Sequence, residues 1–229
     1  MQIKGLQKTT LLDFPDRVAC TVFTGGCNFR CPFCHNASLV LTPSVVENIP
    51  EETFFSFLGK RKGILDGVCI TGGEPLLQKD IVPFIKRIRN EGYTVKLDTN
   101  GSFPEKLKTI VSENLVDYIA IDIKNSEEKY AMTAGINGNC KEVFESIDFI
   151  MSCGVDYEFR TTVVKELHTI QDIENIAKRI NGAKRYFLQS FKDSGDLIDP
   201  EFSAHTEVQM RKMLDVASPY VEICRLRGI

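Results

Sequence analysis

The chain has 229 residues, of which 43% are hydrophobic, and its 28 basic and 31 acidic residues give a net charge of −3. This length and apolar content suffice for one substantial core, so we expect a single domain over residues 1–229. The sequence has no Lys/Arg tract, no apolar run of membrane-spanning length and no secretory signal, which argues against nucleic-acid and membrane partners and favours the cytoplasm.

Short β-rich segments alternate with amphipathic segments of helical length. The predicted strands are 18–24, 68–71, 93–98, 118–124, 157–164, 185–191 and 220–225. The predicted helices are 51–58, 80–92, 104–113, 141–153, 170–180 and 206–216, the clearest of which has Asp80 as its N-cap and ends at Gly92. This alternation implies an α/β fold with mainly parallel strands and right-handed crossovers.

Charged residues occupy one face of three predicted strands and apolar residues occupy the other. The charged residues are Lys96, Asp98, Asp122, Lys124, Glu158 and Arg160. Because helices must cover the apolar face of a parallel sheet, the charged face should point inward. A closed barrel fills its interior with apolar side chains, so we expect a partial, laterally open barrel of the (β/α)6 type with roughly six or seven strands and a wet interior.

Three of the eight cysteines lie in a short loop after the first predicted strand, in the sequence Cys27-Asn-Phe-Arg-Cys31-Pro-Phe-Cys34. Three thiolates at these spacings can hold three irons of a [4Fe-4S] cluster and leave the fourth iron open. A zinc site needs a fourth ligand, for which His35 is poorly placed beside Cys34, and an electron-transfer cluster needs a fourth nearby cysteine. A disulfide needs an oxidising compartment. The loop therefore favours an open-site iron–sulfur cluster.

Further polar residues lie at or near the ends of the other predicted strands. They are Gly72-Gly73-Glu74-Pro75 after the second, Asp98 on the third, Asp122 and Lys124 on the fourth, Arg160 on the fifth and Gln189 on the sixth. Because the carboxyl ends of parallel strands meet at one edge of a sheet, we expect these residues to converge with the cysteine loop on one rim.

The cysteine loop and the Gly-Gly-Glu-Pro motif together resemble the radical S-adenosylmethionine (radical SAM) superfamily. Three further segments resemble the activating proteins of glycyl radical enzymes, in particular the activator of anaerobic ribonucleoside-triphosphate reductase. They are Gly5-Leu-Gln-Lys-Thr-Thr-Leu-Leu-Asp-Phe-Pro15, Phe23-Thr-Gly-Gly-Cys-Asn-Phe-Arg-Cys-Pro-Phe-Cys-His-Asn36, and Asp98-Thr-Asn-Gly101 with Asp122-Ile-Lys124. The resemblance spans nearly the whole chain and is strongest over residues 5–124.

The resemblance implies that Cys27, Cys31 and Cys34 hold a [4Fe-4S] cluster whose open iron binds S-adenosylmethionine. One electron would then break the bond between the sulfonium and C5′, and the resulting 5′-deoxyadenosyl radical would abstract a glycine α-hydrogen from a partner enzyme. The implied partners are a glycyl radical enzyme, here anaerobic ribonucleoside-triphosphate reductase, and an electron donor such as flavodoxin or ferredoxin.

The resemblance also assigns residues to the cofactor. Gly72 and Gly73 would let the backbone approach the methionine moiety and Glu74 would accept from its ammonium group, although a tight turn also explains the glycines. Phe33 would cover the adenine or shield the cluster, or else is an ordinary core residue. Gln189 matches the pattern more loosely as a cofactor contact.

The inward carboxylates of Asp98 and Asp122 need counter-charges. Lys124 and Arg160 would either supply them or hold the carboxylate of the cofactor. We also consider a monovalent cation between Asp98, Thr99 and Asp122, with a closed ion-pair network as the alternative.

The remaining expectations concern two histidines and the alternative functions of the chain. His168 and His205 should lie in or near surface segments. The rival functions are an activator of another glycyl radical enzyme such as pyruvate formate-lyase, a radical SAM enzyme acting on a small molecule, and a non-catalytic iron–sulfur or zinc module.

Overall fold

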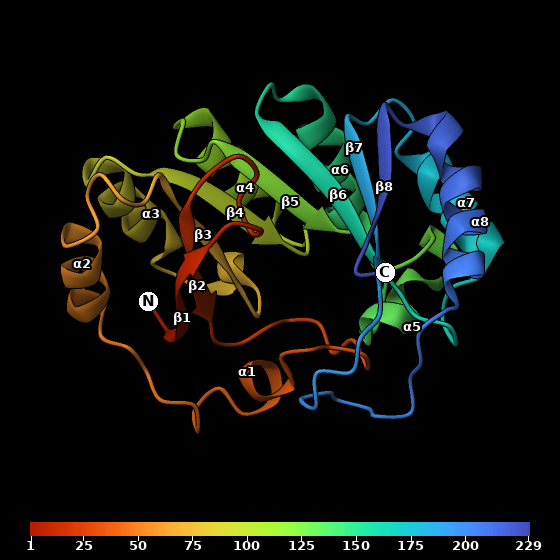
Figure 1. The fold of residues 1–229 in the computed structure, drawn as a ribbon, viewed down its shortest axis with the longest axis horizontal. Helices are drawn as coiled ribbons and strands as arrows, with labels where there is room; N and C mark the ends of the chain where they lie inside the picture. Colours follow the sequence, from red (N-terminus) through yellow and green to blue (C-terminus); the bar gives the residue numbers. More distant parts are fainter. The chain divides into compact units, whose positions relative to one another are not determined.

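The computed structural model describes residues 1–229 and alternates strands with helices (Figure 1). The strands are β1 (Ile3–Thr10), β2 (Ala19–Thr24), β3 (Gly67–Gly72), β4 (Thr94–Thr99), β5 (Tyr118–Asp122), β6 (Asp156–Val163), β7 (Arg185–Ser190) and β8 (Ile223–Arg227). The helices are α1 (Ala37–Leu41), α2 (Glu51–Gly59), α3 (Ile81–Asn90), α4 (Pro104–Ser112), α5 (Tyr130–Ala134), α6 (Lys141–Ser152), α7 (Ile170–Arg179) and α8 (Glu207–Ala217), with 3-10 turns η1 (Pro75–Leu77), η2 (Glu127–Lys129) and η3 (Ser218–Tyr220). No helix is both long enough and apolar enough to cross a membrane.

The strands form one open sheet in the order β1 to β8. β2, β3 and β4 pair in parallel, and so do β6, β7 and β8. β1 runs antiparallel to β2. The expected α/β fold with a mainly parallel, laterally open sheet is confirmed.

The first strand, β1, is absent from the predicted elements, so the expectation of six or seven strands is wrong: the sheet has eight. Its sequence Ile-Lys-Gly-Leu-Gln-Lys-Thr-Thr lacks the alternation that identifies a half-buried strand. Because β1 lies at the edge of the sheet and pairs only with β2, it needs few buried side chains, and only its end residues Ile3 and Thr10 are buried.

The other seven strands and the six longer helices lie within a few residues of their predicted ranges. Gly92 has a φ of +91° just after α3, which agrees with its expected role as a stop. Asp80 precedes α3 but makes no capping hydrogen bond, because its carboxylate contacts the N-terminal ammonium group of Met1 instead.

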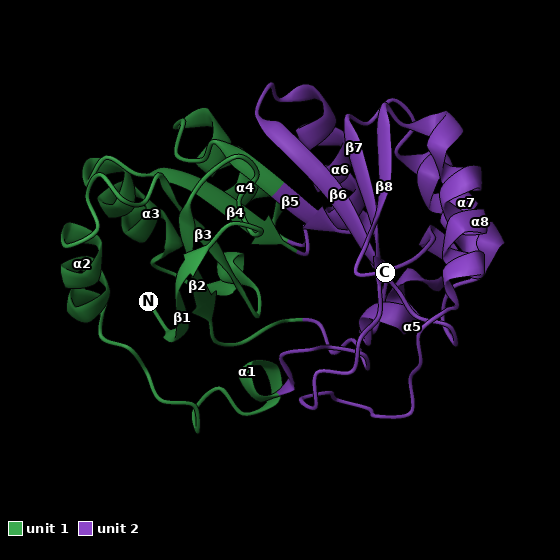
Figure 2. Cartoon of the chain, viewed as in Figure 1, with its two compact units in different colours: residues 1–28, 38–99, 103–119 green, residues 29–37, 100–102, 120–229 purple.

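The chain divides into two compact units (Figure 2). Unit 1 comprises residues 1–28, 38–99 and 103–119, and unit 2 comprises residues 29–37, 100–102 and 120–229. The boundary runs through β5 and through the cysteine loop. The single domain over residues 1–229 stays a prediction.

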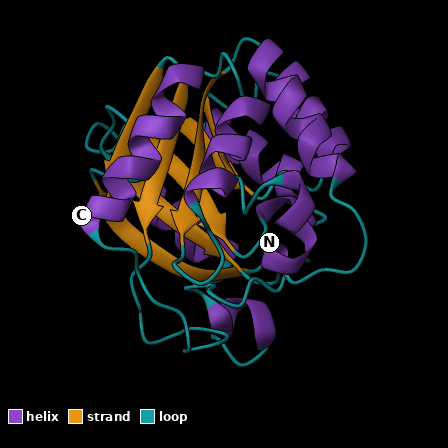
Figure 3. Cartoon of the chain, turned by 90° about the vertical axis from the view of Figure 1, so that its right-hand side faces the viewer, coloured by secondary structure: helices purple, strands orange, loops and turns teal.

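Each unit has its own packed helices. In unit 1, the rings of Phe54, Phe55 and Phe84 from α2 and α3 lie with centroids 5.1 to 5.5 Å apart. In unit 2, α7 and α8 pack side by side next to β7 and β8 (Figures 1 and 3). α8 buries Met210 and Met213, so its apolar face contributes to the core of this unit.

Candidate functional site

The Gly-Gly-Glu turn after β3 packs against the end of β2 within unit 1. The amide of Gly73 donates to the carbonyl of Thr24 at 2.9 Å, and that of Glu74 donates to the carbonyl of Gly26 at 2.8 Å. A Cβ on Gly73 would lie 1.9 Å from the Gly26 oxygen. Gly72 has a φ of +113°, and a Cβ there would lie 2.3 Å from the Thr24 nitrogen. The fold itself therefore requires both glycines, whatever ligand approaches them.

Glu74 is fully buried in unit 1. Its Oε1 accepts from the Leu76 amide at 2.9 Å, which caps η1, and from the Thr99 hydroxyl at 2.7 Å. A buried carboxylate needs such donors, because unpaired burial of its charge would be strongly unfavourable. The structure thus gives Glu74 a structural role, and its contact with an ammonium group stays a prediction.

The counter-charge of Asp98 is Lys96, two residues earlier on β4. Lys96 is 1% exposed and Asp98 is 8% exposed. The Lys96 ammonium also lies 3.9 Å from the Cys69 sulfur. From the sequence we expected Lys124 or Arg160 to be the counter-charge of Asp98. Alternation along the strands puts the charged residues on one face, but it does not show which of them form pairs.

The segment that leads to Cys27 is fixed by two contacts that sequence reasoning missed. The Gln78 side-chain amide donates to the Gly25 carbonyl at 2.7 Å. The Gly26 amide donates to the Leu39 carbonyl at 2.8 Å. No sequence signal distinguished Gln78 from an ordinary surface glutamine. Cys27 itself is partly exposed.

In unit 2, the second half of the cysteine loop rests on the end of α5. The Arg30 amide donates to the Ala134 carbonyl at 2.9 Å, and the buried Cys31 thiol lies 3.8 Å from the same oxygen. A Cβ on Gly135 would lie 2.1 Å from the Arg30 oxygen, and its φ is +62°. α5 was not predicted, because it has only five residues. It supports the loop that carries the predicted ligands.

The segment after β7 covers the other side of this half-loop. The Asp199 amide donates to the Pro32 carbonyl at 2.9 Å, and the Ala37 amide donates to the Asp196 carbonyl at 3.2 Å. The His35 ring stacks on Phe191 with centroids 5.4 Å apart. The cysteine loop of unit 2 is therefore held by backbone hydrogen bonds on two sides.

His168 is 1% exposed, so the expectation that it lies near the surface is wrong. The backbone pairs both of its ring nitrogens: the Val164 amide donates to Nδ1 at 3.0 Å, and Nε2 lies 2.7 Å from the Lys124 carbonyl. Such pairing makes burial of the ring tolerable, and burial lowers its pKa. The buried ring of Phe33 meets His168 edge to face, at 6.4 Å.

The charges at the end of β5 form a cluster within unit 2. Arg160 Nε donates to Asp122 Oδ1 at 2.8 Å, and Lys124 Nζ lies 3.4 Å from Oδ2. Burial raises the pKa of Asp122, but the charges of Arg160 and Lys124 outweigh it and hold that pKa well below its usual range. Glu158 is 2% exposed and accepts both arms of Arg227, at 3.0 and 2.9 Å. Pairing of Asp122 with Arg160 and Lys124 is one of the two roles expected for these basic residues, whereas the pairing of Glu158 with Arg227 was not predicted.

The cluster lies close enough to the cysteine loop to act on Cys34. Burial raises the pKa of the Cys34 thiol, and the charge of Lys124 lowers it. Gln189 lies on β7 in register with Thr162 and Arg227. The charges of Lys124 and Asp122 in unit 2 therefore act on Cys34 in opposite directions.

The three cysteines are divided between the units, with Cys27 in unit 1 and Cys31 and Cys34 in unit 2. No group of three His, Cys, Asp or Glu side chains forms a preassembled metal site. None of the eight cysteines is disulfide-bonded, and three thiols in one loop are the donor set that iron–sulfur clusters use. The residues fit a cluster by their chemistry, and the ligand set stays a prediction.

Comparison with known proteins identifies the family. The model of the radical SAM superfamily matches residues 21–180. The chain therefore belongs to the radical SAM superfamily, whose members are enzymes that use a [4Fe-4S] cluster and S-adenosylmethionine.

Within the superfamily, the chain is similar over 99% of its length, at 33% identity, to a Methanocaldococcus jannaschii protein named "Putative glycyl-radical enzyme activating enzyme MJ1227", of which it covers 96%. It is 26% identical to the pyruvate formate-lyase-activating enzyme of Clostridium pasteurianum over 85% of this chain and 83% of that protein. It is also 30% identical to the GTP 3′,8-cyclase of Aquifex aeolicus over 84% of this chain and 62% of that protein.

A solved structure shares the fold. Streptococcus suis SuiB bound to S-adenosylmethionine matches 88% of this chain and 48% of its own, with a TM-score of 0.69 and 13% identity. This similarity concerns the fold alone.

Proposed function

We propose that this chain activates a glycyl radical enzyme by generating a 5′-deoxyadenosyl radical that abstracts the α-hydrogen of a glycine in that partner. The partner we propose is anaerobic ribonucleoside-triphosphate reductase. The observation that carries the proposal is the combination of the three-cysteine loop with similarity over 99% of the chain to a protein named as such an activating enzyme. When bound, the cluster and S-adenosylmethionine supply the electron transfer and the radical.

The residues of the chain would hold and orient these groups. Cys27, Cys31 and Cys34 would bind the cluster, each as a thiolate. The raised pKa of Cys34 means that metal binding would displace its proton. Phe33, which is 4% exposed, would exclude water on the inner side of the loop.

Within each unit, different residues would contact the methionine moiety, whose ammonium and carboxylate groups are both carried by its α-carbon. In unit 1, Gly72 and Gly73 would let the backbone approach the methionine moiety, and Glu74 would accept from its ammonium group. Asp98 on β4 remains a further proposed contact.

In unit 2, Arg160 and Lys124 pair with Asp122, and Arg160 also lies 3.8 Å from Glu158, which binds Arg227. These three cations outnumber the two carboxylates, and the excess suits the carboxylate of the cofactor. Gln189 on β7 remains a further proposed contact.

A monovalent cation between Asp98, Thr99 and Asp122 is a separate hypothesis. The hypothesis was based on an excess of inward carboxylates. In the structure, however, Lys96 pairs with Asp98 and Arg160 pairs with Asp122, so both carboxylates already have a counter-charge. Activity that depends on potassium or sodium would support the cation. Equal activity with and without both ions would eliminate it.

The proposal is tested by electron paramagnetic resonance of the reductase after anaerobic mixing with the reduced activator and S-adenosylmethionine. A doublet from a glycyl radical is the expected result. Cys31→Ala should abolish both this signal and 5′-deoxyadenosine formation. The matched control is Cys153→Ala, since Cys153 lies outside the loop at the end of α6.

The same experiment separates the rival functions. A doublet on pyruvate formate-lyase but not on the reductase would change the partner and keep the reaction. Formation of 5′-deoxyadenosine with GTP and no protein partner would instead place the chain with the cyclases, one of which is 30% identical to it. Zinc binding without any cleavage of S-adenosylmethionine would refute both the activator function and the cyclase function.

A further inference from the structure

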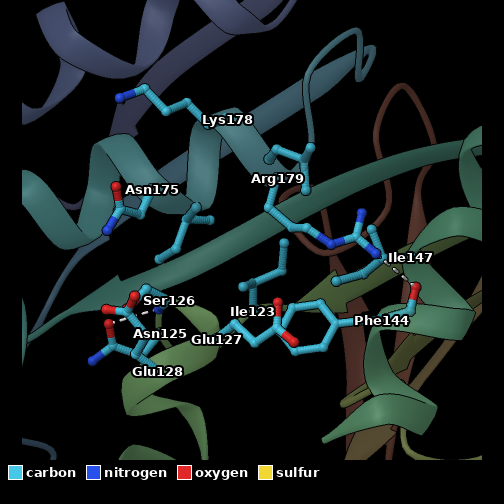
Figure 4. A pocket seen from close by; sticks show the side chains of 12 residues that line it. Ile123, Asn125, Ser126, Glu127, Glu128, Phe144, Ile147, Asn175, Lys178 and Arg179 are labelled. Atoms are coloured by element: carbon cyan, nitrogen blue, oxygen red, sulfur yellow. Dashed lines mark hydrogen bonds between the residues drawn. The ribbon is translucent and has the colours of Figure 1, made fainter.

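A cavity of about 320 Å³ opens in unit 2, and none of its lining residues is among those assigned above (Figure 4). Its walls come from the segment that follows β5 and from helices α6 and α7. Its apolar lining consists of Ile123, Phe144, Ile147, Ile176 and Ile180. A volume of this size lies at the lower end of small-molecule sites and would accept a body of about one aromatic ring.

One residue of the lining carries a buried polar group that the protein does not satisfy. Ser126 lines the cavity and is 5% exposed, yet its hydroxyl has no hydrogen-bond partner. Its backbone amide is paired, because it donates to Asn125 Oδ1 at 2.7 Å. A buried hydroxyl without a partner is unfavourable by about 1–3 kcal/mol, so a ligand that donates to Oγ would recover this loss.

The charges around the cavity favour a cation. Its two basic residues are already paired: Lys178 lies 2.7 Å from Glu174, and Arg179 binds Asp148 through both arms at 2.7 and 2.8 Å. The two acidic residues of the lining, Glu127 and Glu128, are exposed and form no ion pair. The four carboxylates of this neighbourhood therefore outnumber its two cations, which leaves an excess of negative charge.

We propose that this cavity is a binding site for a small amphipathic cation with an apolar body and a primary ammonium head. The body would fill the space between Phe144, Ile147 and Ile176. The ammonium group would donate to Ser126 Oγ and lie beside Glu127 and Glu128. An ammonium group has three donors, so it can satisfy the hydroxyl and a carboxylate together.

The cavity adjoins the charge cluster of Asp122, Lys124 and Arg160 through one residue. Ile123 lines the cavity, and its neighbours Asp122 and Lys124 form the charge cluster with Arg160. Ile123 is buried whereas both of its neighbours are partly exposed, so its side chain points away from theirs. A bound ligand would therefore contact Ile123 without contacting the charge cluster of Asp122, Lys124 and Arg160.

The test uses two probes of nearly equal size and opposite charge, 2-phenylethylammonium and 3-phenylpropionate. Binding to the intact chain is followed through the isoleucine methyl signals in carbon-13 NMR. We expect saturable shifts at Ile123, Ile147 and Ile176 with the ammonium probe, and binding of the carboxylate probe weaker by about tenfold or more. Equal binding of both probes, a preference for the carboxylate, or no saturable shift would overturn the proposal.

Variants at the rim give a second, independent test. Ser126→Ala and Glu127→Gln should each weaken ammonium binding by roughly two- to tenfold. Glu142→Gln is the matched control, because Glu142 is an exposed glutamate of α6 that does not line the cavity. Unchanged affinity in both rim variants would refute the assigned contacts. The outcome does not depend on the proposed function, since no cluster, cofactor or partner enzyme is needed.

Discussion

The hydroxyl of Thr99, the last residue of β4, donates a 2.7 Å hydrogen bond to the carboxylate of Glu74 inside unit 1. The bond joins the end of one strand to the turn that follows its neighbour β3. Both residues are buried, at 3% and 0% exposure, so water cannot replace either partner. This bond fixes the carboxylate that we propose for the ammonium group of the cofactor.

Thr99→Val should destabilise unit 1 because it removes this donor and keeps the shape of the side chain. We expect a loss of about 1–3 kcal/mol in the free energy of unfolding, measured by urea denaturation. Thr53→Val, in an exposed position on α2, should change stability by less than about 0.5 kcal/mol. Equal midpoints for the two variants would show that the bond contributes nothing.

Gly73→Ala should destabilise the chain even without any cofactor, since its Cβ would meet the Gly26 oxygen at 1.9 Å. The expected loss is about 1–3 kcal/mol, as for other overpacked sites. Gly59→Ala provides the comparison, because nothing lies within 4 Å of a Cβ there. The melting temperatures of the two variants, measured without cofactor, would show whether the fold itself requires a glycine at position 73. A Gly73→Ala protein of undiminished stability would contradict the steric argument.

Burial of His168 should make the chain less stable in mild acid. Its pKa is lowered from 6.5 in the folded state, so below about pH 6.5 the unfolded chain binds more protons. The free energy of unfolding should therefore fall as the pH drops from about 7.5 to 5.5. In His168→Gln this fall should be smaller, although the variant should be about 1–3 kcal/mol less stable at neutral pH. His205→Gln should keep the fall, and an identical pH dependence in His168→Gln would contradict the prediction.

Removal of Arg160 should raise the pKa of Asp122. The stability that a lowered carboxyl pKa provides is present above the ordinary value of 3.8 and is lost as the pH falls below it. In Arg160→Met the Asp122 carboxyl signal, followed by carbon-13 NMR, should titrate closer to that ordinary value. Arg185→Met, which removes an arginine paired with Asp156, should leave the Asp122 signal unchanged. A signal that does not move in Arg160→Met would mean that Lys124 alone sets this pKa.

The sequence pattern predicted seven of the eight strands and every long helix, because short β-rich runs and amphipathic segments of helical length stand out in the sequence. It missed β1, α1 and α5, whose lengths or polar sequences leave no periodic pattern. The spacing of Cys31 and Cys34 is read directly from the sequence, because only two residues separate them. The support of that loop by Ala134 and Gly135 was not predictable, since it joins residues about a hundred positions apart.

The amino-acid sequence by itself determined the superfamily, the α/β alternation and the chemical identity of the candidate ligands, because these follow from residue types at short, fixed spacings. Only the tertiary structure decided which charges meet. It paired Lys96 with Asp98 and Arg160 with Asp122, and it buried His168 against the backbone. The physical reason is that alternation along a strand specifies the face on which a side chain lies, whereas its partner depends on the packing of segments distant in the chain.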